Sequence, residues 1–92
     1  LEQALTLAPA EPEVYNDLGI ARIAAGQVEA AVQVWEENLR LHPAFGPSYF
    51  NLGRALAGAG QIQRARAYWR RGLELMPDHP MAAQLRPLLE RD

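Results

Sequence analysis

Apolar residues recur along the chain at helical spacing, and breaks that contain Gly or Pro separate the stretches that carry them. The first stretch places four residues at i, i+3, i+4 and i+7, which is one face of a helix: Tyr15, Leu18, Gly19 and Arg22. Pro12 suits the first turn of that helix, where its missing N–H costs nothing, and Gly26 ends it. The pattern therefore predicts a helix that begins near Pro12 and stops before Gly26.

A second helix is predicted after this break, with an apolar stripe at Val28, Ala31, Val32, Trp35 and Leu39. It ends at His42-Pro43, because the residue before a proline avoids the helical conformation. The same two patterns then return, which predicts a third helix over residues 47–59 and a fourth over residues 62–75. No stretch has the alternating pattern of a strand, so the predicted fold class is all-α.

The chain repeats itself with a period of 34 residues, since Pro9, Pro43 and Pro77 are evenly spaced (43 − 9 and 77 − 43). A shift by that period places many residues on identical ones, among them Tyr15 on Tyr49, Leu18 on Leu52, Gly19 on Gly53, Ala31 on Ala65 and Trp35 on Trp69. Periods of this length are typical of stacked helical repeats. The short turns make each helix pair an antiparallel hairpin, in which Gly and Ala allow close approach and the two buried tryptophans fill the remaining volume.

These positions resemble the tetratricopeptide repeat family, whose pattern is an aromatic residue, then Leu-Gly, then Ala with an aromatic four later, then Pro. The two copies here read Tyr15, Leu18-Gly19, Ala31, Trp35, Pro43 and Tyr49, Leu52-Gly53, Ala65, Trp69, Pro77. The resemblance implies one domain over residues 1–92, built of antiparallel helical hairpins stacked as a right-handed superhelical solenoid. It implies repeats at 12–45 and 46–79, the end of a preceding repeat's second helix at 1–9, and a capping helix at 80–92.

A fifth helix is predicted to begin at Pro80, with Asp78 or His79 as its cap. Its buried side is predicted to hold three apolar residues, Met81, Leu85 and Leu88. Pro87 falls inside this helix and removes one backbone hydrogen bond, so we expect the helix to kink or to end there.

The resemblance also implies a function, because the first helices of such hairpins line a concave groove that takes a peptide or a helix of a partner protein. The candidate groove residues are Asn16, Ile20, Ile23, Phe50, Arg54 and Gln84. The alternative for Ile20, Ile23 and Phe50 is burial under adjacent helices. Some family members clamp the C-terminal carboxylate of chaperones, but Ile20 and Arg54 stand where that clamp has Asn, so this subtype is not expected.

Charge and composition argue against nucleic acid and membranes as partners. The 92 residues carry a formal net charge of −2 and no cysteine, and no apolar run approaches the ~20 residues of a membrane span. The nearest feature to a charge motif is an arginine cluster on the fourth helix, Arg64, Arg66, Arg70 and Arg71. We interpret it as a solvated convex face on which Glu74 offsets Arg70. The alternative is binding of RNA or of an acidic partner.

No residue pattern points to catalysis, a cofactor or a metal, so the chain is not expected to be an enzyme. Ser48 stands at a helix start, where its hydroxyl is predicted to cap backbone N–H groups. His42 and His79 both lack a second metal ligand at i+3 or i+4. Glu36 and Arg40 stand at i, i+4 and are predicted to form a surface ion pair.

The sequence thus predicts a protein–protein interaction module. Two alternatives stand beside it: self-association, and a regulatory repeat segment of a larger enzyme. Self-association would use the apolar residues at the N-terminal end together with the fifth helix, Leu1, Ala4, Leu5 and Leu7 supplying the first surface. Because the gain from a few buried leucines barely exceeds the cost of association, the expected homodimer is weak and concentration-dependent.

Overall fold

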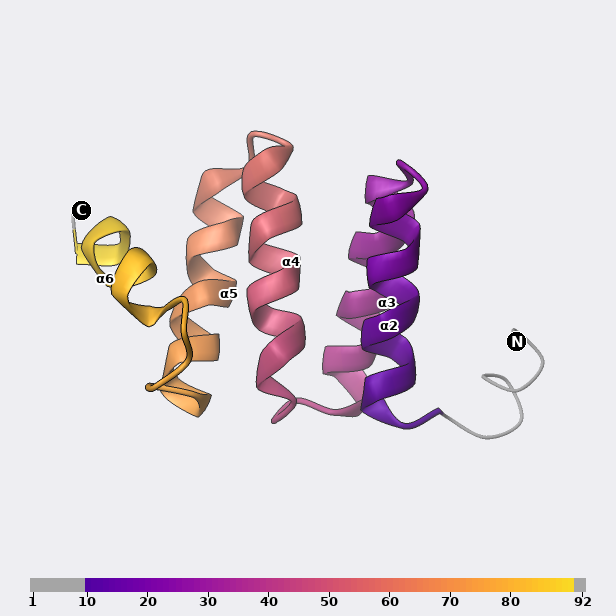
Figure 1. Ribbon diagram of the computed structural model, residues 1–92, viewed down its shortest axis with the longest axis horizontal. Helices are drawn as coiled ribbons and strands as arrows, with labels where there is room; N and C mark the ends of the chain where they lie inside the picture. Colours follow the sequence, from indigo (N-terminus) through magenta and orange to yellow (C-terminus); the bar gives the residue numbers. More distant parts are fainter. Residues whose placement is uncertain (1–9, 91–92) are drawn as a thin grey trace.

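The computed structural model describes residues 10–90, and within that range the chain is helical and contains no strand (Figure 1). The helices are α2 (Pro12–Ala24), α3 (Val28–Leu41), α4 (Gly46–Gly58), α5 (Ile62–Leu75) and α6 (Ala82–Glu90). The predicted all-α class is confirmed, and the first four helices lie close to their predicted limits. The helix end predicted at residues 1–9 lies outside the described residues.

Two antiparallel helical hairpins make up most of the structure: hairpin 1 is α2 with α3, and hairpin 2 is α4 with α5. They stand side by side, and α4 packs against both helices of hairpin 1, more extensively against α3 than against α2. α6 packs on α5 at the end of the stack, as Figure 1 shows. In the described part of the chain, hairpin 2 is therefore covered by α3 and by α6, whereas hairpin 1 is covered by hairpin 2 alone.

Each hairpin reverses direction at a glycine in the left-handed backbone region, Gly26 with a φ of 77° and Gly60 with a φ of 83°. A side chain disfavours that conformation, so glycine suits both turns. In hairpin 1 the turn N–H groups bond back to the end of α2: Gly26 N donates to Ile23 O at 2.9 Å and Gln27 N donates to Arg22 O at 2.8 Å. These bonds satisfy the last carbonyls of the helix and fix where the next helix begins.

The tightest contact inside each hairpin joins a glycine on the first helix to a tryptophan on the second. A Cβ placed on Gly19 would lie 2.2 Å from Nε1 of Trp35, and one on Gly53 would lie 2.3 Å from Nε1 of Trp69. The two tryptophans expose only 2% and 5% of their surface, as predicted. Each indole ring therefore rests on the backbone of the neighbouring helix, and any side chain in place of the glycine would push the two helices apart.

The hydrophobic core is centred on hairpin 2 and on the side of α3 that faces it. Leu52 and Leu56 of α4 are almost completely buried and belong to one apolar cluster with Leu39 of α3. Their counterparts one period earlier are Leu18 and Arg22, which are only half-buried. The difference follows from the stack, because α3 covers this face of α4 and no described segment covers the same face of α2.

The start of α6 agrees in part with the sequence prediction. The helix begins at Ala82 rather than at Pro80. His79 caps it, as predicted: its Nδ1 accepts a hydrogen bond from Met81 N at 3.1 Å, and its carbonyl oxygen accepts one from Ala82 N at 2.8 Å. The backbone N–H groups at the start of α6 thus have His79 as an acceptor, where no preceding helical turn can supply one.

The later part of α6 excludes one of the two alternatives at Pro87, the end of the helix, and corrects the expectation for Leu88. The helix does not end at Pro87 but continues to Glu90. The carbonyl that loses its donor there belongs to Ala83, which is exposed, so water can satisfy it. Leu88 is 41% exposed rather than buried, because the packed side of this helix follows the i, i+4 pair of Leu85 and Leu89.

The contact of Gly53 with Trp69 leads to a stability prediction. Gly53→Ala should lower the free energy of unfolding by about 1–3 kcal/mol, because the new methyl group must displace a buried indole ring. Gly58→Ala is the matched control in the same helix. A Cβ at Gly58 meets nothing within 4 Å, so helix propensity should raise the stability by about 0.5–1 kcal/mol. Urea denaturation of both variants measures the difference, and equal midpoints would contradict the account.

Candidate functional site

Two isoleucines of α2 face a cavity between the hairpins. Ile20 is 48% exposed and Ile23 is 38% exposed. The cavity has a volume of about 250 Å³ and is lined by Ile20, Ile23, Trp35, Asn51, Arg54 and Ala55. We call it the α2–α4 cavity, because all of its lining residues except Trp35 of α3 come from these two helices. The structure thus brings together three of the predicted groove residues, Ile20, Ile23 and Arg54.

Arg54 supplies the charge at this cavity. Its side chain is exposed, and it forms no hydrogen bond or ion pair with another described residue. A guanidinium group carries a permanent positive charge and five N–H donors in a planar fork. The cavity therefore combines apolar walls with an unengaged cation, which suits a carboxylate that stands next to an aliphatic side chain.

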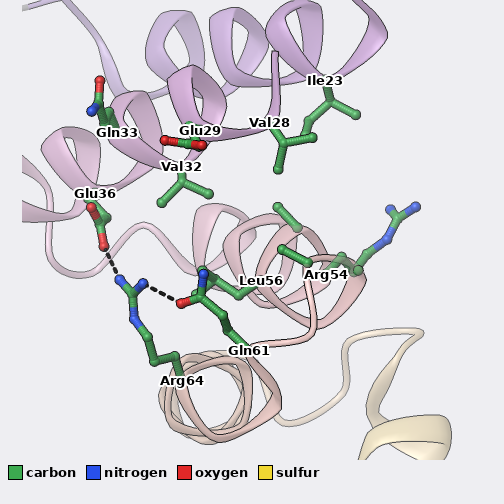
Figure 2. A pocket seen from close by; sticks show the side chains of 13 residues that line it. Ile23, Val28, Glu29, Val32, Gln33, Glu36, Arg54, Leu56, Gln61 and Arg64 are labelled. Carbon is green, nitrogen blue, oxygen red and sulfur yellow. Dashed lines mark hydrogen bonds and ion pairs between the residues drawn. The ribbon is translucent and has the colours of Figure 1, made fainter. Parts of the chain in front are cut away.

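A larger depression lies between α3 and the turn end of hairpin 2 (Figure 2). It has a volume of about 820 Å³, and we call it the edge groove. Its apolar lining consists of Ile23, Val28, Val32, Ala55, Leu56 and Ala59. Figure 2 shows Val28 and Val32 pointing from α3 into this space, with Leu56 and Arg54 on the opposite side. Polar side chains form the rim, namely Glu29, Gln33, Glu36, Gln61 and Arg64.

One end of the edge groove is closed by side chains that join α3 to α5. Arg64 Nη2 lies 2.8 Å from Glu36 Oε2, and its Nη1 donates to Gln61 Oε1 at 2.7 Å. Tyr68 Oη donates to the same Glu36 oxygen at 3.3 Å. Burial raises the pKa of the Tyr68 hydroxyl, and the nearby Glu36 carboxylate raises it further. The hydroxyl therefore remains a donor at neutral pH and helps to hold this end shut.

The predicted ion pair between Glu36 and Arg40 does not form, because Glu36 is engaged by Arg64 across the helix–helix contact. Arg40 pairs instead with Glu37, three residues earlier, and its Nε donates to Glu37 Oε1 at 2.9 Å. This hydrogen bond lowers the pKa of the Glu37 carboxyl group. Both side chains are exposed, so the pair adds little to stability.

The arginine cluster of α5 is largely exposed, but its members also hold neighbouring elements. Arg66 and Arg70 both donate to the carbonyl oxygen of Leu89, at 3.1 Å and 3.2 Å. Positive charge is favourable at this position, because the last carbonyl groups of an α-helix have no donors within the helix. Arg71 pairs with Glu74 at 3.0 Å, where the sequence predicted Arg70 as the partner. The cluster is thus largely exposed, as interpreted, and it also joins α5 to α6.

Asn16 belongs to a polar network that fastens the two hairpins to each other. Its Oδ1 accepts hydrogen bonds from Ser48 Oγ at 2.8 Å and from Asn51 Nδ2 at 3.0 Å. Ser48 Oγ accepts in turn from Asn38 Nδ2 at 2.9 Å, and the same amide donates to Pro12 O at 3.1 Å. Asn38 and Ser48 are completely buried. Asn16 is half-buried at the edge of this network, so its amide oxygen is already engaged within the chain.

Ser48 does not cap α4, contrary to the prediction. The N-cap residue of this helix is Phe45, and no side chain bonds to the free N–H groups there. The Ser48 hydroxyl turns to Asn38 and Asn16 instead, because a buried polar group without a partner costs roughly 1–3 kcal/mol. The Ser48 hydroxyl therefore bonds to side chains of the buried network rather than to the backbone of its own helix.

The next interface along the stack replaces this network with apolar contacts. One period later, the positions of Asn16, Asn38, Ser48 and Asn51 are occupied by Phe50, Gly72, Ala82 and Leu85. Phe50 is 2% exposed, its ring stacks on His79 with centroids 4.0 Å apart, and a Cβ on Gly72 would lie 3.0 Å from its Cζ. The assignment of Phe50 to the groove is therefore wrong, and the alternative of burial is correct.

The other residues considered in the sequence lie away from both cavities. Gln84 is exposed on α6 and lines neither of them. His42 Nε2 lies 3.2 Å from Ala10 O, and His79 caps α6. Residues 10–90 contain no group of three or more His, Cys, Asp or Glu side chains placed to hold a metal ion. No helix in that range is long and apolar enough to cross a membrane.

The edge groove is the feature that helical spacing alone does not reveal. Val28 and Val32 belong to the stripe predicted to be buried, yet Val28 is 37% exposed. A signal is present in the facing segment, where Ala55, Gly58 and Ala59 are all small. Side chains of this size cannot fill the space opposite α3, so a depression is left between the hairpins.

Residues 47–79 span all of α5 and nearly all of α4, and they match the family model of the tetratricopeptide repeat. Residues 47–79 therefore form a tetratricopeptide repeat. Tetratricopeptide repeats are in general protein–protein interaction motifs. Hairpin 1 lies outside the matched residues but reproduces the glycine–tryptophan contact of the matched repeat, at Gly19 and Trp35. No curated protein sequence matches the chain.

The polar network of this repeat protein predicts strong coupling between two buried residues. Asn38→Ala and Ser48→Ala should each lower the free energy of unfolding by about 1–3 kcal/mol, because each leaves polar partners unpaired. The double variant should lose less free energy of unfolding than the two single variants together, by at least about 0.5 kcal/mol. Denaturation of the two single variants and the double variant completes the cycle. Strict additivity would show that the two side chains act independently.

Proposed function

We propose that the chain binds a segment of a partner protein in the α2–α4 cavity, with Ile20, Ile23 and Arg54 as the contact residues. The observation that carries the proposal is the juxtaposition of two exposed isoleucines with a cation that has no partner among the described residues. Aliphatic side chains gain free energy when a partner removes them from water. A carboxylate of the same partner would meet the Arg54 guanidinium group and fix its orientation.

The proposal includes an organisation of the chain into two repeats at 12–45 and 46–79, followed by a capping helix within 80–92. The contrast between α4 and α6 supports the last assignment. Three residues that build the core face of α4 are Tyr49, Leu52 and Leu56, and one period later α6 carries Ala83, Arg86 and Glu90. A polar outer face of this kind is what a terminal repeat element needs for solubility. The role is that of a scaffold and involves no catalysis.

A second candidate function is self-association. Hairpin 1 has a face that no segment within residues 10–90 covers, and it corresponds to the face of hairpin 2 covered by α3. We call it the open face. A cavity of about 260 Å³ lies there, lined in part by Tyr15, Leu18 and Val34. A second copy of the chain that seats an apolar helix on this face would bury the half-exposed Leu18. Stacking of repeats through unlike faces gives either a closed ring or an open stack.

The binding proposal is tested with a displayed library of random peptides, selected against the whole chain and then measured by fluorescence anisotropy as free peptides. Ile20→Glu should weaken binding of the selected peptides at least about tenfold, because it places a carboxylate in the apolar wall of the cavity. Val14→Glu is the matched control, since Val14 is another exposed aliphatic residue of α2 and lines neither the α2–α4 cavity nor the edge groove.

Selected peptides that bind Val14→Glu as the wild type does, but not Ile20→Glu, would support the α2–α4 cavity as the site. Failure to select any peptide, or equal binding to both variants, would reject it. Circular dichroism of both variants ensures that a loss of binding is not a loss of folding.

The self-association candidate predicts a sedimentation-equilibrium mass that rises with concentration from the micromolar to the near-millimolar range. Leu18→Glu should return the chain to the monomer mass, because Leu18 lines the open face. Val14→Glu serves again as the control, since Val14 does not line that cavity. A monomer mass at all concentrations would refute this candidate and leave the binding proposal untouched.

A further inference from the structure

The α2–α4 cavity and the edge groove share part of their walls. Ile23, Arg54 and Ala55 line both of them. The two depressions therefore meet between the end of α2 and the second half of α4. A chain seated over Ile20 in the α2–α4 cavity would pass these three shared residues to reach Val28 and Val32 of α3.

The far end of this path is closed. The Glu36–Arg64 ion pair, at 2.8 Å, joins α3 to α5 there, and Gln61 accepts a second hydrogen bond from Arg64. Figure 2 shows this bridge at the end of the edge groove opposite to Ile23 and Arg54. A partner segment that enters the edge groove from the α2–α4 cavity would meet this ion pair at the other end.

Two charged side chains on the path have no partner among the described residues, Arg54 at the junction and Glu29 on the rim. The other two charged residues of the rim, Glu36 and Arg64, neutralise each other. The apolar surface is likewise divided in two, with Ile20 before the junction and Val28 with Val32 beyond it. The order along the path is therefore apolar, cationic, apolar, with an anion beside the second apolar part.

We propose that the partner segment crosses from the α2–α4 cavity into the edge groove, and that it carries an aliphatic residue, an acidic residue and a second aliphatic residue in that order, with a basic residue near the last. The acidic group pairs with Arg54 and the basic group with Glu29. This inference rests on the proposed function and adds to it the path and the chemistry of the bound segment. A partner confined to the α2–α4 cavity would make no contact with Val28 or Glu29.

The test uses the peptides selected against the whole chain. Val28→Glu should weaken their binding at least about tenfold, because it puts a carboxylate into the apolar wall of the edge groove. Ile62→Glu is the matched control: Ile62 stands one period after Val28, begins α5 as Val28 begins α3, is also exposed, and lines neither depression. A glutamate suits the first turn of either helix, so neither variant is expected to unfold.

A separate set of variants tests the pairing of Arg54 with an acidic residue of the peptide. Arg54→Gln should weaken peptide binding at least about tenfold, and Arg54→Lys should weaken it less. The acidic residue of the peptide can also be changed, from Asp to Asn or from Glu to Gln. This change should not lower the affinity for the Arg54→Gln variant further, because the pairing is already lost there. The selected sequences themselves should be enriched in an acidic residue between two aliphatic ones. Enrichment of basic residues at that position would overturn the assignment.

The outcomes separate the two levels of the proposal. Loss of binding in both Ile20→Glu and Val28→Glu, with Ile62→Glu unaffected, supports the crossing path. Loss in Ile20→Glu alone leaves the proposed function intact and rejects the crossing. Loss in neither variant rejects both, because the peptides would then bind at another surface. Loss in Val28→Glu and Ile62→Glu alike would mean that a negative charge on either outer helix disturbs binding, and this also rejects the crossing.

Discussion

The contact between a glycine backbone and an indole ring is the constraint on which the rest of this structure depends. Gly19 with Trp35, and Gly53 with Trp69, bring the helices of each hairpin together at a separation that no other residue in place of the glycine would permit. Trp35 is at the same time part of the lining of the α2–α4 cavity. The residue that holds hairpin 1 together therefore also shapes the surface to which we assign binding.

The two interfaces along the stack show how one backbone arrangement accepts different chemistry. Between the hairpins, Asn16, Asn38 and Ser48 form a polar network, whereas Phe50, Gly72 and Ala82 fill the equivalent positions at the interface with α6. Hydrogen-bonded networks have directional requirements that apolar packing lacks, so they favour a single register. This network thus sets where Ile20 of α2 stands relative to Arg54 of α4, and with it the geometry of the cavity.

The helices and their order could be predicted from the sequence, because nearby residues determine each of them and the same residues return one period later. Gly26 marks a turn, and Trp35 recurs as Trp69. The errors arose where a second element decides the outcome. Ser48 serves buried amides rather than its own helix, and Phe50 is covered because His79 stacks on it. The edge groove escaped prediction for the same reason, since it results from small residues on α4 that face α3, two helices that helical spacing does not relate.

The measurement that tests the central claim most directly is a nuclear magnetic resonance titration of the ¹⁵N-labelled chain with one selected peptide. The account predicts that the largest amide shift changes fall on α2 around Ile20, on α4 around Arg54 and on the first turns of α3 around Val28, which together outline the joined depressions. The residues of α6 around Arg86 should stay unchanged. Changes centred on α6, or on the open face around Leu18, would contradict the account.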